Sequence, residues 1–275
     1  MKLYIISTKS QKLTTDLLID ACKKRGVHYE VLDPEETCPL DVKVENGDAV
    51  YRVATASHYG AAELEWDLIF KGARSFYRDK NSLLLKRVDA MVFESLGVPA
   101  PRTINYLPKD RVALLKCVDE IGGFPVCLKA LGGSHGIGVM RVDSEQSLFS
   151  VSDYLREQGD MVVMKEYCNV TSSARLVVLG DKVIDSIEYS APKGDFRSNE
   201  GKVPNVSPKQ FSEMVNEIAV RAVKALGLKF SGVDIMITDS GAKVAEVNYP
   251  CFFPRCQMLT GVDIAGQMVE YLMER

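Results

Sequence analysis

Three side chains near the C-terminus carry oxygen atoms at a spacing that suits a metal ion. They are Asp234, Glu246 and Asn248, and two apolar runs around them are separated by Asp239-Ser240-Gly241. Asp and Gly accept the backbone angles of a tight reversal, so this stretch predicts a β-hairpin over 231–248. In a hairpin centred on position 240, positions 234 and 246 lie opposite each other, and positions 246 and 248 share a face.

These three side chains predict a site for a hard cation. Two carboxylates and an amide among apolar residues are costly to bury without a partner. Oxygen ligands suit Mg²⁺, which also takes substrate phosphates, and Mn²⁺ accepts the same ligands. Asp234, Glu246 and Asn248 are therefore candidates to hold one or two Mg²⁺ ions. The alternative is an ordinary hairpin with exposed acids.

A lysine and a glycine-rich segment form a second candidate site. Lys129 ends an apolar strand within Pro125–Val139, and the sequence GGSHGIG follows it. Glycines let backbone N–H groups approach phosphate oxygens, and the lysine adds a positive charge. No Gly-Lys-Ser/Thr follows the glycines, so the segment is not a P-loop. A hairpin with a glycine turn and an exposed lysine is the alternative.

The same loop resembles the cofactor loop of short-chain dehydrogenases, whose Tyr-x-x-x-Lys spacing is matched by Tyr189 and Lys193. Pro192 lies between them and would break the helix that this spacing requires. The residues GVMRVD after the loop also predict a strand rather than a helix. We therefore set this interpretation aside.

Two other segments are weaker when taken alone. The apolar run from Met161 ends in Glu166, Tyr167 and Cys168, where backbone groups at a strand edge could pair with adenine. Residues 193–202, KGDFRSNEGK, are typical of a solvated loop. Arg197 and Asn199 in this loop could instead bind a phosphate or a carboxylate.

Composition limits the classes of function. The chain has 275 residues, a net charge of −3 and 46% hydrophobic residues, enough for a large core in two or three subdomains. The near-neutral charge does not indicate a nucleic-acid partner, and no apolar run is long enough to predict a membrane span. The N-terminal apolar run is too short for a signal peptide. Seven scattered cysteines, an odd number, predict a reducing, cytoplasmic setting.

Periodicity predicts a mixed α/β chain in two parts. Residues 1–80 alternate strands and helices, which predicts a largely parallel sheet. The predicted strands of this part are 3–7, 29–32 and 49–53, and its helices are 14–24 and 61–71. A helix over 81–96 leads into the second part. Its predicted strands are 103–106, 125–131, 139–142, 161–167, 175–178, 183–187 and the hairpin, and its helices are 110–121, 145–156, 208–226 and 263–273.

Taken in order, these segments resemble the ATP-grasp superfamily, and most closely its RimK-like branch of glutamate and amino-acid ligases. YRDKNSLLLKRVDAMVFESLGVPAPRT is similar to the family's entry helix, PVCLK to its second-lysine strand and GGSHGIGV to its phosphate-covering loop. KEYC is similar to its adenine hinge, and GVDIM with EVN to its metal-binding hairpin. ARLVVLGDKVIDSIEYSAPKGDFRSN also follows the family closely, so the resemblance covers most of the chain after residue 80.

The resemblance implies a three-part ATP-grasp fold of the α/β class. It has an N-terminal α/β domain over 1–80 and an ATP-grasp domain over 81–275, with a mobile lid of about 103–165 and a C-terminal antiparallel sheet. The implied activity is ATP-dependent carboxylate–amine ligation through an acyl phosphate, with release of ADP and phosphate. ATP and Mg²⁺ are the implied cofactors. The implied partners are small molecules or peptides with a carboxylate and an amine, and a homo-oligomer is left open.

The resemblance also implies a role for each candidate residue. The implied nucleotide-binding residues are Lys86, Lys129, Gly133, Ser134, Gly136, Gly138, Glu166, Tyr167 and Cys168. Arg175, Arg197 and Asn199 are the implied catalytic residues, which stabilise the acyl phosphate and the tetrahedral intermediate. Asp234, Glu246 and Asn248 are the implied metal ligands.

The sequence departs from the family where the family faces its substrate. Ser173 stands where the pattern has an acid, and EGKVPNV replaces a basic, glycine-rich piece after FRSN. After EVN the chain has Tyr249-Pro250-Cys251-Phe252-Phe253, whose aromatic residues are typical of an apolar pocket. Glutamate is therefore not fixed as the substrate. The alternatives are a protein-modifying glutamate ligase and an ATP-binding protein without ligase activity.

Overall fold

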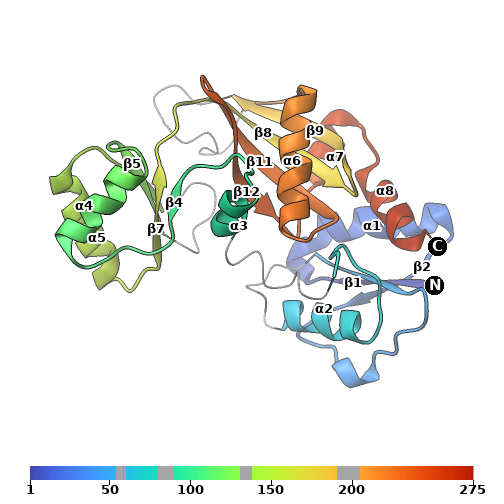
Figure 1. The fold of residues 1–275 in the computed structure, drawn as a ribbon. Coiled ribbons are helices and arrows are strands. Elements are labelled where there is room, and N and C mark those ends of the chain that lie inside the picture. Colours follow the sequence, from blue (N-terminus) through green and yellow to red (C-terminus); the bar gives the residue numbers. More distant parts are fainter. Residues whose placement is uncertain (54–57, 59, 80–88, 131–137, 191–204, 275) are drawn as a thin grey trace.

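The computed structural model describes the whole chain except residues 54–57, 59, 80–88, 131–137, 191–204 and 275. These described residues form a mixed α/β fold, as the sequence predicts, and contain three sheets (Figure 1). None of the helices in the described ranges is long and apolar enough to cross a membrane. None of the seven cysteines, all of which are described, forms a disulfide. The cytoplasmic setting stays a prediction.

The first sheet is parallel, which confirms the expectation from alternating strands and helices. Its strand order is β2-β1-β3. The strands are β1 (Lys2–Ile6), β2 (His28–Leu32) and β3 (Ala49–Arg52), joined by helices η1 (Lys9–Gln11), α1 (Lys12–Arg25) and η2 (Pro39–Asp41) and followed by α2 (Ala61–Phe70). Successive residues of β1 face opposite sides, so Leu3 and Ile5 pack on the α1 side, and Tyr4 and Ile6 pack on the α2 side.

The second sheet is antiparallel and has two helices on one face. Its order is β4-β7-β5-β6. The strands are β4 (Thr103–Ile104), β5 (Val126–Ala130), β6 (Val139–Val142) and β7 (Val162–Glu166), and the helices are α4 (Arg111–Glu120) and α5 (Glu145–Glu157). Leu128 and Met164 are buried together with Leu114 of α4 and Leu148 of α5. Within the described part of the chain, α4 and α5 leave the opposite face, which carries Lys129, uncovered, and we call it the helix-free face. We call this unit the lid sheet.

The third sheet is antiparallel, in the order β10-β9-β8-β11-β12. The strands are β8 (Val170–Leu179), β9 (Lys182–Ser190), β10 (Val206–Pro208), β11 (Phe230–Thr238) and β12 (Gly241–Asn248). Helix α6 (Glu213–Ala225) lies across one face, next to α3 (Asp89–Ser95) (Figure 1). Helices α7 (Pro254–Thr260) and α8 (Ile264–Met273) end the chain and pack on α1.

One hydrophobic core joins the parallel sheet to the five-stranded sheet. Leu3 and Tyr51 belong to the same buried cluster as Phe230 and Val233 of β11. The rings of Tyr51 and Phe230 meet edge to face, with centroids 5.9 Å apart. The lid sheet has a separate core. Separating the first and third sheets would expose apolar surface, whereas the lid sheet can shift without breaking its own packing.

Three elements differ from the expectation. The helix predicted from Pro208 begins at Glu213, because Val206–Pro208 pairs with β9 as an edge strand. Strand β8 begins at Val170, five residues before the predicted start at Arg175, because the intervening residues are mostly polar and do not show the apolar pattern of a strand. Helix α7 is not expected from the sequence, since seven residues give too little periodicity. Of the helix predicted over 81–96, the described part is α3.

A buried ion pair anchors the loop that follows β12. Arg52 Nε donates to Glu65 Oε2 at 2.9 Å, and the Tyr249 hydroxyl donates to Glu65 Oε1 at 2.7 Å. Glu65 is fully buried, and Phe253 and Tyr249 are 0% and 4% exposed. Phe252 is 52% exposed. The aromatic residues of this loop were expected to line a pocket, but two of the three are core residues and only Phe252 is accessible.

We expect Glu65→Ala to lower the free energy of unfolding by about 3–5 kcal/mol, because it removes the carboxylate that balances the buried Arg52 charge. Glu63, two residues earlier on α2, is exposed and is the matched control. Glu63→Ala should change the same quantity by less than about 0.5 kcal/mol. Urea unfolding of both variants tests this, and equal losses would contradict it.

Candidate functional site

The hairpin of β11 and β12 brings two of the predicted metal ligands together through a bulge. Thr238 pairs with Gly241 across a two-residue turn. Continued without a break, this register would place Asp234 opposite Ala245. A bulge shifts the pairing by one residue, so Asp234 lies opposite Glu246. The predicted pairing of these two carboxylates is confirmed, although the turn itself is centred half a residue earlier than predicted.

Asp234 is held by two side chains on the same face of the sheet. Arg175 of β8 lies opposite Asp234 and donates from Nε to Oδ1, and from Nη2 to Oδ2 at 2.8 Å. Asn248 Nδ2 donates to Asp234 Oδ2 at 3.1 Å. Burial alone would lower the pKa of Arg175, but the Asp234 carboxylate outweighs burial and raises it. The guanidinium therefore stays charged, and three predicted site residues meet at one point.

Gly232 makes room for this ion pair. A Cβ at this position would lie 2.6 Å from Cys251 Sγ and 3.1 Å from Arg175 Cδ. The first distance is shorter than carbon and sulfur atoms tolerate, and the second would force the arginine to shift. The small residue opposite Asn248 is thus needed for Arg175 to reach Asp234.

Lys129 reaches the hairpin from the lid sheet. Its Nζ lies 3.9 Å from Glu246 Oε2, and the two side chains are 31% and 47% exposed. Such an exposed pair contributes little stability. The ion pair is informative because it places a cation of the lid sheet next to a carboxylate of the five-stranded sheet. Gly138 closes the strand pair on which Lys129 lies: it has φ +87° and its carbonyl accepts from the Ala130 N–H at 2.9 Å.

The donor set of the hairpin suits a small, hard cation. Glu246 is accessible, and Asn248 directs its amide nitrogen at Asp234, which leaves its carbonyl oxygen for another partner. Among the residues that the structure describes, no group of three or more His, Cys, Asp or Glu side chains is arranged to hold a metal ion. With the two carboxylates, the Asn248 carbonyl oxygen could complete a set of three oxygen ligands, a kind that Mg²⁺ accepts.

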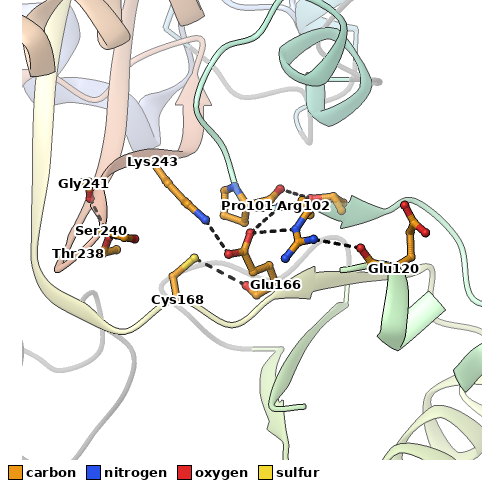
Figure 2. Close-up of polar contacts among 10 residues, drawn as sticks. Pro101, Arg102, Glu120, Glu166, Cys168, Thr238, Ser240, Gly241 and Lys243 are labelled. Atoms are coloured by element: carbon orange, nitrogen blue, oxygen red, sulfur yellow. Dashed lines mark hydrogen bonds and ion pairs between the residues drawn. The ribbon is translucent and has the colours of Figure 1, made fainter. Parts of the chain in front are cut away.

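Glu166 ties the lid sheet to the five-stranded sheet (Figure 2). Lys243 of β12 donates from Nζ to Glu166 Oε1 at 2.6 Å, and the Arg102 backbone N–H donates to Oε2 at 3.1 Å. Burial alone would raise the pKa of Glu166, but the Lys243 and Arg102 hydrogen bonds outweigh it and lower the pKa. Because both carboxylate oxygens already accept hydrogen bonds, the backbone of Glu166 is the more available partner for a base.

Tyr167 and Cys168 follow the last residue of β7. The Tyr167 ring lies under the Arg141 guanidinium, 4.5 Å from its centre, and Arg141 Nη1 donates to the Tyr167 hydroxyl at 3.3 Å. The Cys168 thiol points to the Glu166 carbonyl oxygen at 3.9 Å (Figure 2). Burial raises the pKa of this thiol, so it is neutral near pH 7. Residues 166–168 therefore form a half-buried segment at the junction of the two sheets.

Six of the described site residues lie on five strands of two sheets, and Gly138, Tyr167 and Cys168 lie in the adjoining loops. Six predicted residues lie outside the described part of the chain: Lys86, Gly133, Ser134, Gly136, Arg197 and Asn199. The prediction omits Arg102 and Lys243, which bind Glu166 from positions 64 and 77 residues away. No local pattern marks such contacts. It also omits Lys165, which lies on the same lid face as Lys129.

The fold and the site are those of an ATP-dependent ligase built on two facing sheets. Residues 82–272 match the RimK-like ATP-grasp domain, so the chain belongs to the RimK-like ATP-grasp family. It is a carboxylate–amine ligase of that class and uses ATP. These findings confirm the family, the fold and the general reaction that the sequence predicts.

Named relatives agree with this class. The chain is 30% identical over 293 residues to a probable alpha-L-glutamate ligase of Citrobacter koseri, which covers 99% of this chain and 95% of the relative. It is also 30% identical, with the same coverage, to a ribosomal protein bS6–L-glutamate ligase of Escherichia coli K12.

Solved structures show the same fold. The ATP-grasp ligase PsnB, complexed with a minimal precursor, has a TM-score of 0.74 at 19% identity over 98% of both chains. A D-alanine–D-alanine ligase of Bacillus anthracis has a TM-score of 0.72 at 17% identity, over 100% of this chain and 96% of that one. At such identities the likeness establishes the ATP-grasp fold alone.

We expect Glu166→Gln to lower the free energy of unfolding by about 1–3 kcal/mol near neutral pH, because it loses charge-assisted hydrogen bonds. The pKa of Glu166 is lowered on folding, so its contribution is full above pH 4.5, the ordinary glutamate value, and is lost as pH falls through the lowered pKa.

The difference between wild type and Glu166→Gln in urea unfolding should therefore be smaller at about pH 3.5 than at about pH 7. Glu157→Gln, at an exposed position of α5, is the control and should show little difference at either pH. An undiminished Glu166→Gln difference at the acid pH would contradict the assignment.

Proposed function

We propose that this ligase binds ATP between the lid sheet and the five-stranded sheet. The observation that carries the proposal is the approach of Lys129 to Glu246, which sets a phosphate-binding cation against a metal-binding carboxylate. Lys129 and the backbone at Gly138 would contact the phosphates. The remaining nucleotide-binding residues of the proposal are Lys86, Gly133, Ser134 and Gly136, with the adenine on the backbone of Glu166, Tyr167 and Cys168.

The proposed metal ligands are Asp234, Glu246 and Asn248. One or two Mg²⁺ ions held there, or Mn²⁺ in their place, would neutralise charge on the phosphate oxygens. Arg175 fixes the orientation of the Asp234 carboxylate, which is 8% exposed. Asn248 positions its carbonyl oxygen by donating its N–H to the same carboxylate.

The proposed reaction joins a carboxylate to an amine in two displacements. A substrate carboxylate oxygen attacks the γ-phosphorus as the bond to ADP breaks, and an acyl phosphate forms. The amine nitrogen then attacks the carbonyl carbon, phosphate leaves with the C–O electron pair, and the amine gives up a proton. Positioning and charge neutralisation dominate such steps. Arg175, with Arg197 and Asn199, would stabilise the acyl phosphate and the tetrahedral intermediate.

We propose that residues 103–165 act as the mobile lid of an ATP-grasp domain over 81–275, preceded by an N-terminal domain over 1–80. The separate core of the lid sheet supports this division. Closure of the lid over the site would exclude water, which otherwise hydrolyses the acyl phosphate.

The proposed substrates are an amino acid or peptide that supplies the carboxylate and a second that supplies the amine. The relatives named as glutamate ligases support this class. Glutamate itself is not assigned, because Ser173 and Phe252 stand at positions that depart from the family. Phe252 is accessible, so it is the aromatic residue of its loop that could contact a substrate.

A screen of amino acids and short peptides in pairs, read by phosphate release and by the mass of the product, identifies the substrates. A protein-modifying glutamate ligase would turn over only with glutamate and a peptide or protein acceptor. ATP binding without ADP release for every pair would favour the alternative of a nucleotide-binding protein that has lost ligase activity.

We expect Glu246→Ala to lower Mg²⁺-dependent ADP formation by at least about 100-fold, because it removes an anionic ligand opposite Asp234. The side chain is accessible, so the melting temperature should change by no more than about 2 °C. Glu217→Ala, at an exposed position of α6, is the matched control and should keep wild-type turnover. Near-normal turnover of Glu246→Ala would refute the metal assignment.

A further inference from the structure

Two neighbouring strands of the lid sheet place two lysines on its helix-free face. Lys165 on β7 pairs with Cys127 on β5, and Arg141 on β6 pairs with Cys127 from the other side. Residues paired across an antiparallel sheet point to the same face. Lys129 is two residues beyond Cys127 and shares that face. Three cations, at positions 129, 141 and 165, therefore lie on the surface that looks toward the hairpin.

Two of these three cations have a partner within the described residues. Arg141 donates to Asp143 at 2.8 Å and lies over the ring of Tyr167. Lys129 lies 3.9 Å from Glu246. The Lys165 side chain makes neither a hydrogen bond nor an ion pair with any residue that the structure describes, and Asp89 and Glu246 act on its charge only at longer range.

The surroundings of Lys165 leave its charge unbalanced. Its side chain is half-buried. Burial lowers the pKa of the Lys165 ammonium, and the positive charge of Lys129 lowers it further. Burial also raises the pKa of Cys127, the residue opposite, to about 11, so that thiol is neutral near pH 7. An ammonium in such a place is stabilised when an anion binds beside it.

The position along the strands indicates which anion. Lys165 comes directly before Glu166–Cys168, the proposed base-binding segment, whereas Lys129 comes directly before the glycine-rich segment. Lys165 therefore lies nearer the base end of the nucleotide than Lys129 does. An ammonium has three donors and no acceptor, and it binds phosphate as a point charge.

We propose that Lys165 is an additional phosphate-binding residue, whose Nζ donates to the α-phosphate of ATP while Lys129 contacts the phosphates farther from the base. The inference rests on the proposed function, because it takes the nucleotide to lie between the two sheets. It adds Lys165 to the nucleotide-binding residues that the resemblance to the family implies.

The test is the affinity of the Lys165→Met variant for ATP, ADP, AMP and adenosine, measured by calorimetry or by competition with ADP. All three nucleotides should bind about 10- to 100-fold more weakly, since each carries the α-phosphate. Adenosine binding should be unchanged. Lys165→Arg, which keeps the charge, should retain most of the affinity. Lys116→Met, at an exposed position of the lid helix α4, is the matched control.

The melting temperature separates a binding role from a structural one. Without nucleotide, Lys165→Met should melt at or above the wild-type temperature, because the variant no longer buries an unbalanced charge. Addition of ATP should then stabilise it less than wild type. Lower stability without nucleotide, or a variant that fails to fold, would overturn the inference in favour of a structural role.

Three affinity results would also overturn it: unchanged ATP affinity, a loss confined to ATP and ADP, or an equal loss for adenosine. Failure of the wild-type protein to bind ATP would instead refute the proposed function on which the inference rests. Wild-type binding that Lys165→Met leaves intact would refute only the role of Lys165.

Discussion

The pairing of β11 with β8 on one side and with β12 on the other is the constraint on which the site depends. Strand alternation sends Val233 and Ile235 into the core beneath α6 and sends Asp234 to the opposite face. A slip of one residue would turn the carboxylate into the apolar core and turn the two apolar side chains away from it. The apolar face therefore favours this register, which places Arg175 and Glu246 opposite Asp234.

Ionic contacts of different strength join the lid sheet to this framework. The bond between Lys243 and Glu166 is short and largely shielded, and it lies where the chain passes from one sheet to the other (Figure 2). The contact between Lys129 and Glu246 is longer and accessible. The short contact at the junction, the longer one at Lys129 and the separate lid core are consistent with the proposed lid movement, with the Glu166 end as its hinge.

The parallel sheet is attached in another way. Its core continues into that of the five-stranded sheet, and the buried contacts of Glu65 with Arg52 and Tyr249 cross the boundary. The loop after the β11–β12 hairpin is therefore held by buried contacts with the parallel sheet. A change of substrate in this part of the chain would have to act through its accessible residues, of which Phe252 is the large apolar one, rather than through the buried aromatic rings.

The sequence by itself determined the fold class, the hairpin, the Lys129 strand and the types of ligand, because alternation and turn residues are local signals. It placed Asp234 opposite Glu246, yet the bulge that achieves this pairing is set by contact between strands. Tertiary structure alone decided that Arg175 holds Asp234, that Lys243 binds Glu166, that Tyr249 is a core residue and that Lys165 lacks a partner among the described residues. Each of these features depends on residues that are far apart in the chain. The packing of whole sheets and helices brings such residues together, and no local sequence pattern encodes that packing.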